Sequence, residues 1–183
     1  MLIRSAQVSD APALLDIYAP YVRDTAITFE YDIPSEAEFA RRIENTMQRY
    51  PYLVLEDGGK VLGYAYAGTF KARAAYDWAV ETTIYLRQDA HGKGYGRALY
   101  TALEEELKRR HFLNAYACIT WAEQEDAYLT HASPLFHERM GYRLCGTFSQ
   151  CGYKFGRWYD MIWMEKHLGT HGENPLPVRQ PAF

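Results

Sequence analysis

A strand pattern, a glycine-rich turn and a helical pattern follow one another between residues 79 and 107. The segment AVETTIYL (79–86) alternates its residues between two faces, as a β-strand does. In HGKGYGRALY (91–100) the glycines are Gly92, Gly94 and Gly96, and leucines spaced by four residues follow them. Glycine is costly inside regular structure, so this density indicates a close approach to the backbone. Because the first N–H groups of a helix lack partners within it, the pattern predicts a binding site for an anion such as phosphate.

Two common phosphate-binding motifs do not fit this loop. A P-loop requires G-x-x-x-x-G-K-[ST], whereas here Gly94 follows Lys93. A dinucleotide-binding loop requires G-x-G-x-x-G and an acidic residue about twenty positions later, and the strand-like segment NAYACITW (114–121) contains no acid. A flexible turn before a helix, without a ligand, remains an alternative on the local pattern alone.

The rest of the chain predicts further strands and helices in mixed order, which is typical of an α/β domain. The segment 52–68 is a hairpin around Asp57-Gly58-Gly59, and Ser35 begins an amphipathic helix over 36–49 with the capping-box pattern S-x-x-E. The other expected elements are strands at 2–6, 114–121, 142–150 and 157–166, a helix capped by Ser9 that Pro20 ends or bends, and a short helix at 134–140 stopped by Gly141. We expect one domain over 1–168 and a loosely ordered tail over 169–183.

The composition argues against several classes of protein. The formal net charge is −3 and no long basic run is present, which argues against a nucleic-acid partner. The three cysteines form no C-x-x-C pair and no signal-peptide pattern opens the chain, so we expect a reduced, cytoplasmic protein. No apolar run is long enough for a membrane span, and the six histidines show no metal-binding spacing.

The loop HGKGYG (91–96) resembles the signature [Q/R]-x-x-G-x-[G/A] of the GCN5-related N-acetyltransferases, with His91 in the place of Gln or Arg. The resemblance covers residues 2–168. It is closest to the phosphinothricin N-acetyltransferase-like branch, because AYDWAVETTIYL (75–86), FHERMGY (136–142) and GYKFGRWYDMIWMEK (152–166) are similar to segments of that branch. The resemblance implies the GNAT fold, a central mixed, V-splayed β-sheet flanked by helices, and acetyl-CoA as cofactor.

The same resemblance implies a set of cofactor-binding residues. The end of the strand, with Ile84, Tyr85 and Leu86, would contact the pantetheine arm, and a backbone N–H near Leu86 would hold the thioester oxygen. The pyrophosphate would bind the loop residues His91, Gly92, Lys93, Gly94, Tyr95, Gly96 and Arg97. Relatives carry a cofactor-contacting Asn four positions before the helix that holds FHERMGY. Here Thr130 or His131 stands in that position, and Ser133 is retained.

Two residues are the expected catalytic pair. Glu81 is the candidate general base, and its alternative role is that of an exposed strand residue paired with a neighbouring cation. His137 is the candidate acid for the coenzyme A thiolate, with Tyr142 and Tyr153 as rivals and a packed helix histidine as the alternative. For the acceptor, the branch implies substrate contacts from Lys71, Arg73, Glu81, Thr82 and Thr83.

These residues predict acetyl-CoA-dependent N-acetylation of a small amine by direct transfer in a ternary complex. The expected acceptor is an amino acid or analogue such as phosphinothricin, methionine sulfoximine or methionine sulfone. Another amine (a polyamine, an aminoglycoside or a protein N-terminus) and a non-catalytic acyl-CoA-binding module are the alternatives. The segment AEQEDAYLTHAS (122–133) is longer than the link in relatives and is expected beside the acceptor mouth. The resemblance also implies a homodimer and no membrane partner.

Overall fold

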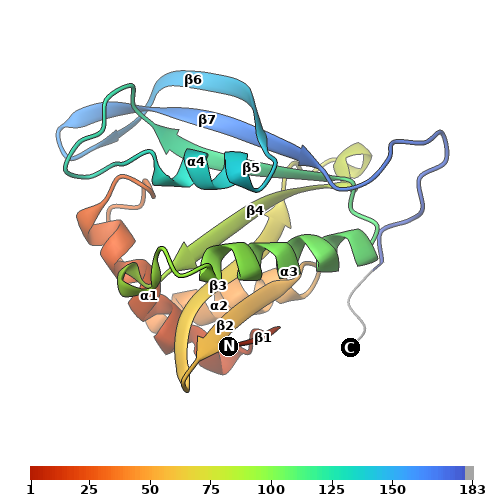
Figure 1. Cartoon of the computed structure of the whole chain (residues 1–183), viewed down its shortest axis with the longest axis horizontal. Coiled ribbons are helices and arrows are strands. Elements are labelled where there is room, and N and C mark those ends of the chain that lie inside the picture. The colour runs from red at the N-terminus through yellow and green to blue at the C-terminus, as the bar shows by residue number, and fades with distance from the viewer. Residues whose placement is uncertain (180–183) are drawn as a thin grey trace.

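A computed structural model describes residues 1–179; residues 180–183, the end of the predicted tail, lie outside the described part. Seven strands in residues 1–179 form one sheet in the order β1-β2-β3-β4-β5-β7-β6 (Figure 1). The strands are β1 Leu2–Ser5, β2 Tyr52–Asp57, β3 Lys60–Thr69, β4 Ala79–Leu86, β5 Asn114–Trp121, β6 Arg143–Lys154 and β7 Arg157–His167. The helices are α1 Ala11–Asp24, α2 Glu36–Met47, α3 Tyr95–Arg109 and α4 Ala132–Arg139, with short 3-10 turns η1 Val8–Asp10, η2 Ala74–Tyr76 and η3 Gln88–Ala90.

The sheet opens between its two central strands. β4 and β5 run parallel and pair only from Ala79↔Asn114 to Glu81↔Tyr116 within residues 1–179. Beyond Glu81, β4 stays paired with β3 while β5 stays paired with β7, so the two halves of the sheet diverge (Figure 1). This geometry confirms the predicted mixed, splayed sheet, and it leaves one side of the end of β4 without a strand neighbour.

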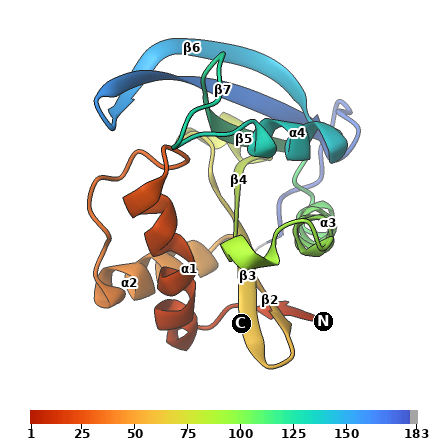
Figure 2. The ribbon, with the colours of Figure 1, turned by 60° about the vertical axis from the view of Figure 1, so that its left-hand side comes forward.

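The helices cover both faces of the sheet, with α1 and α2 on one face and α3 on the other (Figure 2). Alternation along the strands explains this arrangement: Val54 packs into the cluster under α1 and α2, while its neighbour Leu55 packs under α3. Each of these side chains is fully buried. The leucine stripe of α3 that the sequence predicts, Leu99, Leu103 and Leu107, lies in the second of these clusters.

Several local predictions are confirmed at their capping and turn residues. The Oγ of Ser35 accepts a hydrogen bond from the backbone N–H of Glu38 at 3.2 Å and begins α2. The carboxylate of Glu38 pairs instead with arginines one turn later, so only half of the capping box forms. The hairpin β2–β3 turns through Gly58 and Gly59, both with positive φ, and Gly141 ends the short helix with φ 88°.

The predictions that Ser9 caps α1 and that Pro20 ends it are wrong, while a bend at Pro20 stays a prediction. A 3-10 turn comes first, Asp10 is the N-cap, and α1 continues past Pro20 to Asp24. Proline removes one backbone hydrogen bond from a helix interior. Here the next turn buries Tyr21 and Val22 in the core, and this burial offsets the loss.

The strand β6 is longer than the sequence predicts. It runs through Cys151 to Lys154, so most of the expected connection at 151–156 is strand, with an irregular register between Phe148 and Gly152. A bulge of this kind interrupts the two-residue alternation on which strand recognition depends. The true turn lies at Phe155 and Gly156, which both have positive φ.

The described part of the tail lies against the domain. The Nε1–H of Trp78 donates to the carbonyl of Leu176 at 2.8 Å, and the N–H of Arg179 donates to the carbonyl of Arg110 at 3.0 Å. The division into a domain over 1–168 and a loose tail over 169–183 stays a prediction. Within residues 1–179, no helix has the length and apolar character needed to cross a membrane.

Candidate active site

The glycine loop and the end of β4 enclose a cavity of about 420 Å³. It opens where β4 and β5 diverge, between the N-terminus of α3 and the start of α4. Its lining brings together most of the predicted cofactor-binding residues: Ile84, Tyr85, Leu86, His91, Gly92, Gly94, Gly96, Arg97 and Ser133. With Tyr21 and Ile27, the lining of the first cavity comes from three stretches of the chain: 21–27, 84–97 and 132–140.

The loop backbone needs glycine at two positions. Gly92 has φ 74°, and Gly94, the N-cap of α3, has φ 81°. An added Cβ at either position would meet no atom within 4 Å, so conformation rather than crowding requires these glycines. No side chain caps α3 at Gly94. The loop thus fits an anionic phosphate group, because its approach is open and the first-turn N–H groups face it.

The end of β4 presents backbone groups to the gap. The N–H of Arg87 donates to the carbonyl of Leu62 on β3 at 2.8 Å. Because successive residues of a strand point their N–H groups to opposite sides, the N–H groups of Leu86 and Ile84 are directed away from β3, toward the gap. The hydroxyl of Tyr21 donates to the Leu86 carbonyl at 2.5 Å and accepts from the Nε2–H of His91 at 3.0 Å.

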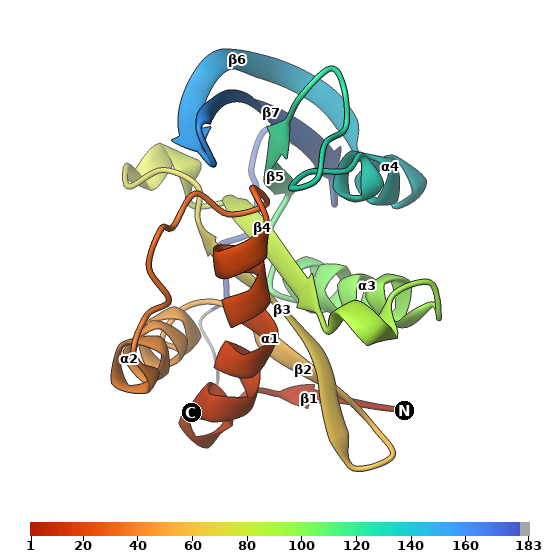
Figure 3. The same cartoon turned by 90° about the vertical axis from the view of Figure 1, so that its left-hand side faces the viewer.

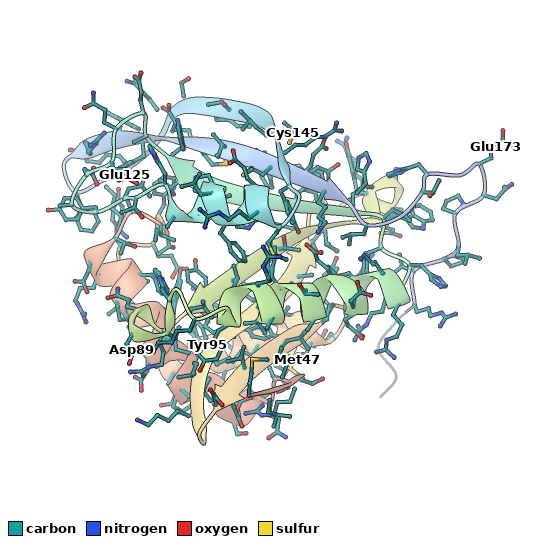
Figure 4. All side chains as sticks on the ribbon, viewed as in Figure 1. Met47, Asp89, Tyr95, Glu125, Cys145 and Glu173 are labelled. Atoms are coloured by element: carbon teal, nitrogen blue, oxygen red, sulfur yellow. The ribbon has the colours of Figure 1, made fainter. Side chains whose placement is uncertain are left out.

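Three predicted cofactor residues do not bring their side chains into this cavity. The Nζ of Lys93 donates to the carbonyl of Asp89, and the hydroxyl of Tyr95 donates to the Asp57 carboxylate at 2.6 Å. Figure 4 labels Tyr95 and Asp89 near the start of α3. The ring of Tyr95 packs against the α3 core, because the first helical turn directs it away from the loop. Thr130 is exposed and lines neither this cavity nor its neighbour. Lys93 and Tyr95 therefore contribute only their backbone groups to the phosphate-binding loop.

A second cavity of about 460 Å³ adjoins the first. The two share Ile27, Ile84, Tyr85 and Ser133, so they meet at the point where the sheet opens. The second cavity contains the candidate catalytic residues Glu81 and His137 together with Thr83. Both residues of the predicted pair therefore line one cavity beside the first, and their catalytic roles stay a prediction.

Burial raises the pKa of the Glu81 carboxyl above its ordinary value, and the ammonium group of Lys71 partly opposes this shift. The Nζ of Lys71 lies over the ring of Phe70, 5.2 Å from its centroid, and acts on Glu81 through space. A carboxylate with a raised pKa is a better proton acceptor than one in bulk water. The environment of Glu81 is thus suited to a general base.

His137 does not have the charge state that the sequence suggests. It is 4% exposed, and burial lowers its pKa to about 4. Its Nδ1–H donates to the carbonyl of Ser133 at 2.8 Å, and its Nε2 accepts from the hydroxyl of Tyr100 at 3.1 Å. This pKa favours a neutral imidazole at neutral pH and the packed alternative, while the role of His137 as the acid stays a prediction. Of the rivals, Tyr142 is buried with its pKa raised to about 12, and Tyr153 is exposed on β6.

The lowered pKa of His137 predicts acid sensitivity. The unfolded chain takes up a proton near pH 6.5 and the folded protein only near pH 4. The free energy of unfolding should therefore fall by about 3 kcal/mol as the pH drops from 7 to 4. Denaturant titrations of the wild type, of His137→Gln and of the exposed control His167→Gln measure this. The fall should shrink by that amount only in His137→Gln, and equal falls in all three proteins would contradict the assignment.

Only some of the residues predicted to contact the acceptor line the second cavity. Thr83 lines the second cavity, whereas Thr82 points to the other face. The Oγ1 of Thr82 lies 2.6 Å from the Tyr100 hydroxyl, so Thr82 belongs to the core and not to the acceptor site. This is a correction that strand alternation explains. Lys71 and Arg73 are exposed and do not line the cavity.

Several lining residues were not foreseen. Ile27 and Phe29 come from the segment after α1, and Tyr66, Cys118, Cys151 and Met161 come from four different strands. The alternation of β5 could have placed Cys118 on the face of the cavity. No local pattern could have placed Ile27 or Phe29, because their segment has no regular structure and reaches the site only through tertiary contacts.

A sheet that opens beside an uncapped glycine loop, with a half-buried carboxylate in the adjoining cavity, can hold a phosphate-bearing acyl donor next to a proton acceptor. Residues 3–163 match the family described as acetyltransferase (GNAT) domain. The chain therefore belongs to the GNAT acetyltransferases, and its cofactor is acetyl-CoA, as the resemblance predicts.

Relatives from one branch match nearly the whole chain. The phosphinothricin N-acetyltransferase of Streptomyces viridochromogenes is 34% identical over 97% of this chain and 92% of that protein. The L-methionine sulfoximine/L-methionine sulfone acetyltransferase of Pseudomonas paraeruginosa is 35% identical over 91% of this chain and 94% of that protein. A crystal structure of a GNAT superfamily phosphinothricin acetyltransferase from Sinorhizobium meliloti in complex with acetyl-CoA is 34% identical, with a TM-score of 0.85 over 98% of this chain and 97% of that one.

Proposed function

We propose that the protein transfers the acetyl group of acetyl-CoA to the amine of an amino acid or analogue of the phosphinothricin, methionine sulfoximine or methionine sulfone type. The observation that carries the proposal is the junction of the two cavities at Ile84 and Tyr85. It places the half-buried carboxylate of Glu81 next to the cavity that begins at the glycine loop. The names of the relatives support the acceptor class.

The residues of the chain have separate tasks in this reaction. Acetyl-CoA supplies an activated acetyl group when bound. Glu81 would accept the proton of the acceptor ammonium, directly or through a water molecule, and the proton that the nitrogen loses as the amide forms would go to the departing coenzyme A thiolate. The N–H of Leu86, directed to the gap, is placed to donate to the thioester oxygen. His137 stays neutral and holds the junction through Ser133 and Tyr100.

Direct transfer is favoured over an acyl-enzyme. Cys118 lies in the second cavity, but burial raises the pKa of its thiol to about 12. The thiolate is the nucleophilic form of cysteine, so Cys118 stays largely inactive at neutral pH. The three free cysteines also support a reducing, cytoplasmic location.

Two of the three acids of the insert, Glu125 and Asp126, are engaged by other groups of the chain. The Asp126 carboxylate accepts hydrogen bonds from the N–H groups of Tyr128 and Leu129 and pairs with Arg157. Glu125 accepts from the N–H of His131. Contacts within the chain therefore occupy two of the three acids, which favours an amino-acid-like acceptor over a polyamine.

The acceptor class is tested by competition. The protein is incubated with acetyl-CoA and an equimolar mixture of methionine sulfone, phosphinothricin, alanine, spermidine and kanamycin, and the N-acetylated products are quantified by mass spectrometry. We expect methionine sulfone or phosphinothricin to give the dominant product. Dominant acetylation of spermidine or kanamycin would overturn the acceptor class, and coenzyme A binding without any product would favour the binding-module alternative.

We further propose a homodimer formed through the edge strand β6. Within residues 1–179 this strand has no neighbour on one side, and it exposes Leu144 (59%) and Phe148 (53%), while Trp158 (56%) is exposed at the start of β7. Exposed apolar residues on an edge strand favour pairing with a second copy. Light scattering should give a molar mass twice the chain mass of 21.2 kDa. In Phe148→Glu the molar mass should fall to that of the monomer. A monomeric wild type at micromolar concentration would contradict the dimer.

A further inference from the structure

Lys154, the last residue of β6, contacts the segment that follows α1. Its side chain is 3% exposed, and its Nζ donates to the backbone carbonyls of Val22, Thr25 and Thr28, each at 2.8 Å. An ammonium group has three N–H donors, so all of them are used. A buried cation is costly to desolvate, and burial lowers the pKa of Lys154, which the charge of Glu30 partly opposes. Such a group needs a structural or functional reason.

Lys154 supplies a donor to carbonyls at and beyond the C-terminus of α1. In a continued helix the carbonyl of Val22 would accept from the N–H of Ala26, but that N–H donates to the carbonyl of Tyr128 at 3.0 Å. The Tyr21 carbonyl is bound by the Oγ1 of Thr25. Lys154, on the other half of the sheet, therefore caps the C-terminus of α1. Its positive charge also complements the negative end of the helix dipole.

The segment held in this way forms part of the wall of the active site. Figure 3 shows the chain after α1 reaching the part of the sheet that carries β5 and β7. Ile27 lines both cavities and Phe29 lines the second. We call residues 25–29 the wall segment. Its position depends on contacts across the opening of the sheet, because it contains no helix or strand.

Gly152, two residues before Lys154, fixes the same segment by a second contact. A Cβ at Gly152 would lie 2.2 Å from the Cε2 and Cζ atoms of Phe29, so the ring lies directly on the β6 backbone. Lys154 thus holds the carbonyls of the wall segment, and Gly152 gives space to the ring that faces the acceptor. Lys154 and Gly152, both on β6, thus position the wall segment through two different contacts.

We propose that Lys154 is a positioning residue which, together with Gly152, sets the acceptor side of the active site by fixing the wall segment. This inference rests on the proposed function, because it assigns the second cavity to the acceptor. Phe29 lines only the second cavity, so loss of the contact affects acceptor binding more than acetyl-CoA binding.

The test uses Lys154→Met, which keeps the packing of the stem and removes the donors, and Gly152→Ala, which displaces the Phe29 ring without a change of charge. Lys60→Met, at an exposed position, is the matched control. Initial rates are measured with acetyl-CoA and methionine sulfone. We expect the acceptor KM to rise about tenfold or more in both variants, with the acetyl-CoA KM within about threefold of wild type.

Hydrogen exchange separates the inference from the proposed function. In Lys154→Met the amides of Ala26 and Ile27 should exchange faster, while amides of α3 keep their protection. Unchanged exchange in the wall segment, or an unchanged acceptor KM in both variants of an active enzyme, would overturn the role of Lys154. A wild type that acetylates none of the tested amines would overturn the proposed function, and the exchange result would still decide the role of Lys154.

Discussion

Replacing Glu81 by glutamine lowers kcat by about 10² to 10⁴, the range that a positioned general base contributes. Glutamine keeps the shape of the side chain but cannot accept a proton. Because Glu81 lines only the second cavity, the affinity for acetyl-CoA should stay within about twofold of wild type. Steady-state rates with methionine sulfone and calorimetric titration with acetyl-CoA measure the two quantities.

Glu105→Gln is the matched control, because this carboxylate is exposed on α3 and pairs with Lys108. It should leave both quantities unchanged. The wild-type rate should rise with pH through the raised pKa of Glu81, since the base acts only when deprotonated, and this limb should be absent in Glu81→Gln. Turnover of Glu81→Gln equal to that of wild type would remove Glu81 from the mechanism.

Replacing Gly94 by valine weakens acetyl-CoA binding by about 5- to 30-fold. Gly94 has φ 81°, and the left-handed conformation costs an L-residue about 1–2 kcal/mol, more for a β-branched side chain. The loop relieves this strain by leaving the conformation that presents its N–H groups to the pyrophosphate. The predicted defect therefore lies in cofactor affinity and not in the chemical step.

Gly172→Val is the control for Gly94→Val, since Gly172 has no positive φ and nothing lies within 4 Å of its Cβ position. Calorimetry with acetyl-CoA and melting temperatures of both variants distinguish local strain from unfolding. Wild-type affinity in Gly94→Val would show that the loop conformation does not determine cofactor binding.

The parts of the site that the sequence could predict are those with local signals. The strand over 79–86, the glycine loop and the helix after it follow from residue alternation, glycine spacing and a leucine stripe. Each of these signals lies within a short window of sequence. Alternation places Glu81 on one face of that strand, but its assignment to the site comes from the resemblance to the GNAT branch.

The parts that could not be predicted depend on contacts between distant segments. The neutral state of His137 results from its burial against Tyr100 and Ser133, and no property of its own helix indicates this. The wall of the acceptor cavity joins Phe29 to Gly152 and carbonyls after α1 to Lys154. These contacts bridge more than a hundred residues, so periodicity cannot report them.

The central claim is that the two cavities form one active site that binds both substrates at once and passes the acetyl group directly. Initial-rate kinetics with acetyl-CoA and methionine sulfone both varied tests this claim most directly. Direct transfer in a ternary complex predicts double-reciprocal lines that intersect. Parallel lines would indicate an acetylated enzyme intermediate, and that result would contradict direct transfer and bring Cys118 back as a nucleophile.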